Sequence, residues 1–275
     1  MEESRRVSGN RTAEYLVREY YKELNKQPDK PLAEKPKTEP EKPNPDIQPP
    51  TTINLNDPQN YILFPQTNEH FDLLIAKKRL AYDAEVDKAS KKLGLNLQDN
   101  NQGYIGNINW EQALNLNKEL GNFTLNPKLF AEFLKLLKSG RAFNGAGKKV
   151  DPKELEQILN EITEVRNPWR AEWLDNKYSK SNDKIQVTYH KFDSSGNLVE
   201  VTEQLDPETL IQNKTPGINL EDWIENPTLQ GLPKSNVKDG SLYFWQPTEG
   251  RVAGFYAYAG GAGLGCYGGP LYSYP

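Results

Sequence analysis

The chain has 275 residues, a length that predicts one large domain or two modest ones and is sufficient to bury a hydrophobic core. Hydrophobic residues make up 36% of it and the mean hydropathy is −0.81, so part of the chain is expected to lie outside any core. The net charge of −4 excludes a basic surface that would attract nucleic acid. The single cysteine, Cys266, excludes an internal disulfide and a multi-cysteine metal site, and two histidines leave little material for a metal centre.

The sequence contains no signal for membrane insertion or secretion. No apolar run approaches the ~18 residues that a membrane helix needs. The first residues carry charges throughout and lack the apolar segment of a secretory signal. We therefore expect no membrane insertion and take the cytoplasm as the default location, with display on a cell or virion surface left open.

The first 59 residues are predicted to form a short helix and a linker. Residues 1–26 contain an amphipathic helix over 11–25, whose apolar side chains lie near one face: Tyr15, Leu16, Tyr20 and Leu24. Residues 27–59 form the linker, because eight of the 24 residues from 27 to 50 are proline. Lys and Glu are interleaved with these prolines, which predicts an extended, solvated spacer.

Residues 60–165 are predicted to be mainly helical, with four helices. The first runs to about Gly94 on apolar side chains at three- and four-residue spacing: Phe71, Leu74, Ile75, Tyr82, Val86, Ala89 and Leu93. The second is capped by Asn109, with Gln112 three residues on, and ends at Gly121.

The third and fourth helices each begin at a capping residue followed by proline. The third opens at Asn126-Pro127 and stops at Gly140, with an apolar face of Leu129, Phe130, Phe133, Leu134 and Leu137. The fourth opens at Asp151-Pro152 and ends at Pro168, with inward side chains at Leu155, Ile158, Leu159, Ile162 and Val165.

After Trp169 the periodicity changes to that of strands. Ile185, Val187 and Tyr189 alternate before the turn at 193–197, and Val199 and Val201 alternate after it, which predicts a hairpin. Short helices are expected over 205–211 and 220–225, the latter capped by Asn219, and strands over 241–246 and 251–259. Strands combined with helices in this order indicate an α+β fold.

The last 25 residues, from Arg251, contain seven glycines and six aromatic residues. Glycine buries no side chain, so this composition is unsuited to an ordinary core. Tyrosine among small residues is typical of a binding loop, in which rigid rings supply contact area. A sticky, disordered terminus is the alternative.

An alternation within this segment favours the binding interpretation. Residues of structural type recur along it: Val252, Ala253, Phe255, Ala257, Ala259, Ala262, Leu264, Cys266, Pro270 and Ser273. The positions between them hold only Gly, Tyr or Leu: Gly254, Tyr256, Tyr258, Gly260, Gly261, Gly263, Gly265, Tyr267, Gly268, Gly269, Leu271, Tyr272 and Tyr274. Alternation places the two sets on opposite faces of an extended chain, one packed and one presented.

Four segments resemble the variable proteins of diversity-generating retroelements, most closely those of small-genome archaea and uncultured bacteria. They are EVRNPWRAEWLD (164–175), KTPGINLEDWIENPTLQGLPKSN (214–236), GSLYFWQP (240–247) and the tail RVAGFYAYAGGAGLGCYGGPLYSYP. The resemblance covers roughly residues 105–275. It implies a C-type lectin-like domain over 166–275, with a variable region at 252–275.

The resemblance also implies a mechanism and a site. In this family a reverse transcriptase copies a template repeat with errors at adenines, and the altered copy replaces the 3′ end of the gene. Asn codons changed at their first two bases reach Gly, Tyr and Leu but not Lys, Glu, Gln, Met or Trp, and none of these five occurs after Arg251. The 13 Gly, Tyr and Leu positions would then contact ligand, and Val252, Ala253, Phe255, Ala257, Leu264 and Cys266 would be scaffold. Members usually continue into a Leu-Gly-Val-Arg strand that this sequence lacks, so an open edge is expected.

Other chemistry is weaker in the sequence. Gly263–Gly268 matches GxGxxG but lacks a following helix, and Cys266 is expected to be a buried small hydrophobe.

Four carboxylates, Glu161, Glu164, Glu172 and Asp175, lie near Arg166 and Arg170 and are expected to form structural ion pairs. Gln246-Pro247-Thr248 lacks the third ligand of a lectin calcium site. Three tryptophans, Trp173, Trp223 and Trp245, are expected in the core.

These observations favour a non-enzymatic protein that binds an unidentified protein or cell-surface ligand, with no cofactor, no metal and no nucleic-acid partner. Replacing Tyr256 and Tyr258 by Ala is then expected to weaken binding and leave unfolding nearly unchanged. A structural protein that self-associates through an adhesive tail is the alternative, and an enzyme on a related scaffold is a weaker one. The oligomeric state is left open.

Overall fold

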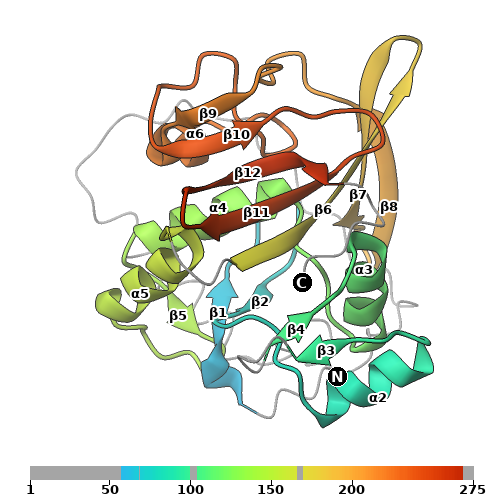
Figure 1. The fold of residues 1–275 in the computed structure, drawn as a ribbon. Helices are drawn as coiled ribbons and strands as arrows, with labels where there is room; N and C mark the ends of the chain where they lie inside the picture. Colours follow the sequence, from blue (N-terminus) through green and yellow to red (C-terminus); the bar gives the residue numbers. More distant parts are fainter. Residues whose placement is uncertain (1–56, 68, 100–103, 166–169, 269–275) are drawn as a thin grey trace.

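The computed structural model describes residues 57–67, 69–99, 104–165 and 170–268 (Figure 1). The helix predicted over 11–25 and the spacer over 27–50 lie outside these residues. Strands and helices mix throughout the described chain, which confirms the α+β class.

A seven-stranded sheet organises the second half of the chain, in the order β8-β7-β6-β11-β12-β10-β9. Its members are β6 (Arg170–Ser181), β7 (Lys184–Phe192), β8 (Leu198–Gln204), β9 (Lys214–Ile218), β10 (Leu242–Trp245), β11 (Val252–Tyr258) and β12 (Gly261–Gly268). Neighbouring strands are antiparallel except β10 and β12, which are parallel. The predicted β7–β8 hairpin and the strands at β10 and β11 are confirmed. Figure 1 shows β11 and β12 side by side in the middle of the sheet.

The turn of the β7–β8 hairpin is built as the sequence suggests. The carboxylate of Asp193 accepts hydrogen bonds from the backbone N–H groups of Ser195 and Asn197. Gly196 adopts a φ of +83°, which favours glycine. These local bonds fix the hairpin register.

The first predicted helix is wrong in its first half. Tyr61–Phe64 (β1) pairs antiparallel with Leu73–Ala76 (β2), and β5 (Phe143–Asn144) completes a small sheet in the order β2-β1-β5. The α-helix begins only at Ala84 and ends at Lys92 (α2), with Asp83 as its N-cap. The short apolar run 73–75 fits a buried strand as well as a helix, and long-range pairing with β1 decides between them.

Three further helices form where the capping residues predict them. They are α3 (Trp110–Glu119), α4 (Pro127–Lys138) and α5 (Pro152–Thr163). Asn109 and Gln112 form a reciprocal capping box at α3, and Asn126 caps α4. The helix α5 ends at Thr163, so Val165 follows it and is 53% exposed instead of packed inward. The remaining short elements are a 3₁₀ turn, η1 (Pro58–Asn60), and the strand pair β3 (Gln98–Asp99) and β4 (Ile105–Gly106).

The helix predicted over 205–211 is also wrong. Residues in this stretch form a turn, and Thr209 pairs in a β-bridge with Lys234. The helix α6 (Leu220–Glu225) is confirmed, with the side chain of Asn219 accepting a hydrogen bond from the N–H of Asp222.

One hydrophobic core joins the helices to the large sheet. The Phe255 ring of β11 contacts Phe130 of α4, with ring centroids 5.2 Å apart, and Trp223 of α6, at 6.4 Å. This core contains side chains from β1, α4, α5, β6 and β12 as well, so the change of periodicity at residue 165 does not separate two cores. The helices α2 and α3 pack around a smaller cluster of Val86, Ala89, Leu97 and Leu116.

Candidate functional site

The β11–β12 hairpin divides its side chains between two faces of the sheet. Phe255 lies opposite Leu264 and Ala257 opposite Ala262, and these four side chains are buried in the core. Gly254, Tyr256 and Tyr258 alternate with them along β11, and they lie opposite Gly265, Gly263 and Gly261 of β12, respectively. Paired residues of a sheet share a face, so the glycines and tyrosines lie together on the face opposite the core that contains α4 and α6.

All six residues carried over as scaffold are buried: Val252, Ala253, Phe255, Ala257, Leu264 and Cys266. Ala259, also of structural type, lies exposed in the turn between the strands. A bulge between Val252 and Gly254 interrupts the strict alternation, which explains how both Val252 and Ala253 are buried.

Strand β10 brings two more aromatic residues to the glycine and tyrosine face. In the parallel β10–β12 register, Tyr243 lies opposite Gly263 and Trp245 opposite Gly265. Ring centroids are 6.3 Å apart for Tyr243 and Tyr258, and 5.7 Å apart for Trp245 and Tyr256, both edge-on. These distances are typical of favourable aromatic pairs.

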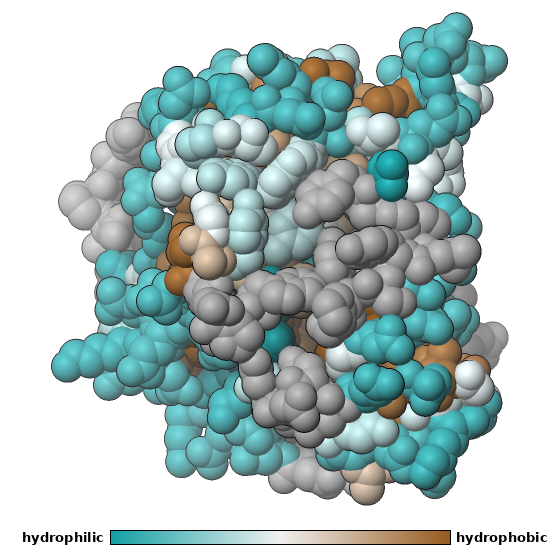
Figure 2. Space-filling model, in the orientation of Figure 1, coloured by the Kyte–Doolittle hydropathy of each residue, from teal (hydrophilic) through white to brown (hydrophobic). Residues whose placement is uncertain are grey.

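We call this surface the aromatic face: the rings of Tyr243, Trp245, Tyr256 and Tyr258 around the glycines Gly261, Gly263 and Gly265. Figure 2 shows a pale area of intermediate hydropathy over β10, β12 and β11, with hydrophilic residues above it. The two β10 residues are absent from the set predicted from the tail. The alternation of Leu242 and Phe244 with Tyr243 and Trp245 is the signal that could have found them.

The rings cover the glycines from both neighbouring strands. A Cβ atom added to Gly265 would lie 1.5 Å from the hydroxyl oxygen of Tyr256. One added to Gly261 would lie 3.1 to 3.2 Å from ring atoms of Tyr243. The glycines therefore allow rings from β11 and β10 to lie across β12.

The residues expected to be presented differ in their exposure. Tyr258 is partly exposed and Gly260 is exposed, but Tyr256 is only 4% exposed. Four glycines are buried as well: Gly254, Gly261, Gly263 and Gly265. Tyr267 and Gly268 belong to β12, whereas Gly269, Leu271, Tyr272 and Tyr274 lie outside the described residues.

Of the three tryptophans expected in the core, only one is fully buried. Trp223 is fully buried, and its ring N–H donates to the carbonyl of Gly231 at 2.9 Å. Trp173 and Trp245 are partly exposed, and Trp173 lies opposite Gly254, next to the aromatic face. Its ring N–H donates to the carbonyl of Ile108, which connects β6 to the start of α3.

Cys266 lies on the core side of β12 and is fully buried. Its thiol lies 3.3 Å from the hydroxyl of Tyr178, and burial raises the pKa of Cys266 to about 12. A thiol that stays protonated is a poor nucleophile. The GxGxxG segment containing it is a strand rather than a loop before a helix, so it lacks the geometry of a dinucleotide site.

Two of the four carboxylates expected in structural ion pairs, Glu161 and Glu172, pair with Arg170, whereas Asp175 pairs with His190. The guanidinium of Arg170, largely buried, pairs with the carboxylates of Glu172 and Glu161. It also donates to the backbone carbonyl of Glu161 at 2.8 Å. These contacts connect the end of α5 to β6.

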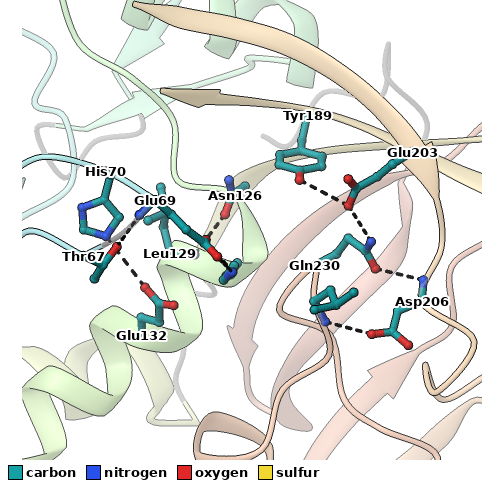
Figure 3. Close-up of polar contacts among 12 residues, drawn as sticks. Thr67, Glu69, His70, Asn126, Leu129, Glu132, Tyr189, Glu203, Asp206 and Gln230 are labelled. Carbon is teal, nitrogen blue, oxygen red and sulfur yellow. Dashed lines mark hydrogen bonds and ion pairs between the residues drawn. The ribbon is translucent and has the colours of Figure 1, made fainter. Parts of the chain in front are cut away.

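Two polar clusters lie near α4 and the β7–β8 hairpin (Figure 3). In one, Nδ1 of His70 donates to the carbonyl of Phe71, and its Nε2 faces a carboxylate oxygen of Glu132 at 4.0 Å. Burial lowers the pKa of His70 and raises that of Glu132. The neutral form of each side chain is favoured, so the pair is not a strong ion pair.

In the other cluster, Glu203 of β8 accepts hydrogen bonds from Tyr189 at 3.3 Å and from Gln230 at 2.6 Å (Figure 3). Burial, with a smaller contribution from Glu203, raises the pKa of Tyr189 to about 12. The amide of Gln230 also accepts from the backbone N–H of Asp206. These bonds attach the loop around residue 230 to the sheet.

Within residues 57–67, 69–99, 104–165 and 170–268, no group of three or more His, Cys, Asp or Glu side chains is arranged to hold a metal ion. The helices of this part of the chain are all too short or too polar to cross a membrane. Comparison with models of known families, with characterised proteins and with solved structures found no match.

Proposed function

We propose that this chain is a non-enzymatic binding protein that recognises a protein or surface ligand through the aromatic face. The observation that carries this proposal is that the β11–β12 hairpin places different residue types on its two faces. Its Phe, Ala, Leu and Cys side chains face the core, and its glycines and tyrosines face the other way beside Tyr243 and Trp245. A binding surface on a rigid sheet needs this separation, since contact residues can then change without disturbing the core.

Tyrosine and tryptophan suit such a surface. Each ring supplies a large, rigid and amphipathic contact area at little cost in side-chain entropy. Three rings of the face are partly exposed: Tyr243, Trp245 and Tyr258. Tyr256, which is buried, has a different role in this proposal: it packs edge-on against the Trp245 ring.

We further propose that the domain is a C-type lectin-like scaffold diversified by a retroelement, as its resemblance to that family implies. The support is the agreement between residue type and position along the hairpin. Six of its Gly and Tyr positions lie opposite one another on the side away from the core: Gly254, Tyr256, Tyr258, Gly261, Gly263 and Gly265. The six residues carried over as scaffold are buried. Variation at the Gly and Tyr positions would then leave the core side of the hairpin unchanged.

The test is the DNA that follows the coding region in the native genome. We expect a near-copy of the codons for residues 252–275, differing mainly where the copy has adenine, beside a reverse transcriptase gene. The absence of both would remove the diversification mechanism.

Sequencing the gene from many individuals of the source population provides an internal control. Variation is expected at the codons for the 13 Gly, Tyr and Leu positions and not at the neighbouring codons for Phe255, Ala257, Leu264 and Cys266. Variation spread evenly over both sets contradicts the proposal.

A further inference from the structure

Gly265 occupies a special position on the aromatic face. It lies opposite Gly254 of β11 on one side and Trp245 of β10 on the other. The Tyr256 ring reaches diagonally across it, so that an added Cβ atom would lie 1.5 Å from the hydroxyl oxygen and 2.4 Å from Cζ. Real Cβ atoms do not approach other heavy atoms this closely, so a side chain at 265 and this position of the Tyr256 ring exclude each other.

We propose that Gly265 is a specificity-determining residue that holds the Tyr256 ring flat in the sheet, and that any larger residue at 265 drives this ring out toward the ligand. The inference rests on the proposed function, because it concerns which surface the aromatic face presents. It predicts that residue 265 acts through Tyr256 as well as through its own contacts.

A side chain at residue 265 is expected to move the Tyr256 ring because the backbone of β12 is held in place. β12 pairs with β11 on one side and β10 on the other, so a shift of its backbone would break hydrogen bonds on both sides. The atoms of Tyr256 that would clash belong to the far end of a side chain with two rotatable bonds. Rotation about these bonds is therefore the cheaper response.

Gly263 and Gly254 differ from Gly265 in what an added Cβ atom would meet. A Cβ at Gly263 would lie 2.1 Å from the backbone carbonyl oxygen of Tyr243, so substitution there requires the backbone to move. A Cβ at Gly254 would meet Tyr256 only at 3.4 Å and a backbone oxygen of Glu172 at 3.2 Å, a much milder contact. Among these three glycines, only Gly265 is covered by the end of a movable ring.

The consequence is a coupling between two positions of the face. With glycine at 265, Tyr256 is 4% exposed and packs edge-on against Trp245. With a side chain at 265, the ring leaves Trp245 and becomes part of the exposed surface. Two proteins that differ only at residue 265 would then present different sets of rings.

The experiment measures ring exposure and stability in the full-length chain without any ligand. Native protein is treated with tetranitromethane and nitration of each tyrosine is followed by peptide mass spectrometry. In the parent chain, Tyr256 should react as slowly as the buried Tyr178 and more slowly than the partly exposed Tyr258. In Gly265→Ala, the nitration rate of Tyr256 should rise to that of Tyr258 while the rate of Tyr178 stays unchanged.

A double-mutant cycle tests whether the Tyr256 ring causes the loss of stability in Gly265→Ala. Gly265→Ala is expected to lower Tm by roughly 3–8 °C in the parent chain, as the ring loses its packing. The same substitution in a Tyr256→Ala background should lower Tm by much less, because no ring remains to be displaced. Gly250→Ala, at a glycine where an added Cβ would meet nothing within 4 Å, is the control and should lower Tm equally in both backgrounds.

Each outcome decides the question. If Gly265→Ala alone fails to fold but Tyr256→Ala/Gly265→Ala folds, the ring is the obstacle and the inference stands. Equal losses of Tm in the two backgrounds, or a Tyr256 nitration rate that does not change, overturn it. Neither result bears on the proposed function, whose test is the variation of the gene itself.

Discussion

Asp175 of β6 accepts two hydrogen bonds from a single residue, His190 of β7. Its Oδ2 lies 2.8 Å from the backbone nitrogen of His190 and 3.0 Å from Nδ1 of the ring. The carboxylate side chain is only 3% exposed. This contact joins two neighbouring strands at the point where Asn126, the cap of α4, donates to the carbonyl of His190.

The hydrogen bond to Asp175 raises the pKa of His190 above its ordinary value of 6.5. The folded protein therefore binds the His190 proton more tightly than the unfolded chain. The resulting stabilisation is fully present below pH 6.5 and is lost as the pH rises through the folded-state pKa. Urea unfolding of the parent chain and His190→Gln between pH 5 and about pH 9 measures it: the difference in unfolding free energy should shrink as the pH rises.

Asp175→Asn is the matched control for this prediction. The amide oxygen can still accept the backbone N–H of His190, but the negative charge that favours the imidazolium is removed. The unfolding free energy of Asp175→Asn should therefore lack the same pH dependence. A difference between parent and His190→Gln that stays constant with pH would contradict the assignment.

The two tyrosines of β11 should respond differently to removal of the ring. Tyr256→Ala is expected to destabilise the fold by about 2–4 kcal/mol, because a buried ring packed on Trp245 is lost. Tyr258→Ala should cost less than about 1 kcal/mol, since this ring is partly exposed at the end of the strand. Chemical denaturation of both variants checks this; comparable losses would mean that the two rings are equally part of the core. The expectation that both substitutions leave unfolding unchanged thus remains only for Tyr258.

Cys266 should be inert in the folded protein. It is fully buried, and its pKa of about 12 keeps the thiol protonated at pH 8. We expect a disulfide reagent such as Ellman's reagent to leave the native chain unmodified and to react with one thiol per chain in denaturant, since Cys266 is the only cysteine. Rapid reaction under native conditions would place this side chain at the surface and contradict the core position of β12.

Sequence predicted best those features that neighbouring residues determine. Asn109 and Asn126 mark the starts of α3 and α4 because a capping side chain bonds to N–H groups two or three residues away. The two faces of β11 follow equally from alternation, which is a property of any strand. These features depend on residues close together in the chain.

The features that sequence missed depend on distant partners. The pairing of β2 with β1 overrode a helical spacing of Phe71, Leu74 and Ile75. The parallel pairing of β10 with β12 brought Tyr243 and Trp245 beside the hairpin, and nothing within either segment specifies that neighbour. The burial of Tyr256 has the same origin, because it depends on Gly265 of the next strand and Trp245 beyond it.

Two glycines with similar positive φ values provide a last prediction. Gly231 and Gly250 have φ values of +81° and +72°, so alanine is strained at both. The surroundings differ: a Cβ at Gly250 would meet nothing within 4 Å, whereas one at Gly231 would lie 2.2 Å from backbone atoms of Lys128 in α4. The loop of Gly231 is thus pressed against the first turn of this helix, where its carbonyl accepts the N–H of the buried Trp223.

Gly250→Ala should therefore cost only the backbone strain, about 1–2 kcal/mol. Gly231→Ala should cost roughly 3 kcal/mol or more, because the loop must also move away from α4 and release Trp223. Urea unfolding of both variants gives the difference, and the indole N–H resonance of Trp223 in an NMR spectrum reports whether its surroundings change only in Gly231→Ala. Equal costs would show that conformation alone sets the requirement for glycine at 231, and that the contact between this loop and α4 contributes little to the fold on which the aromatic face is built.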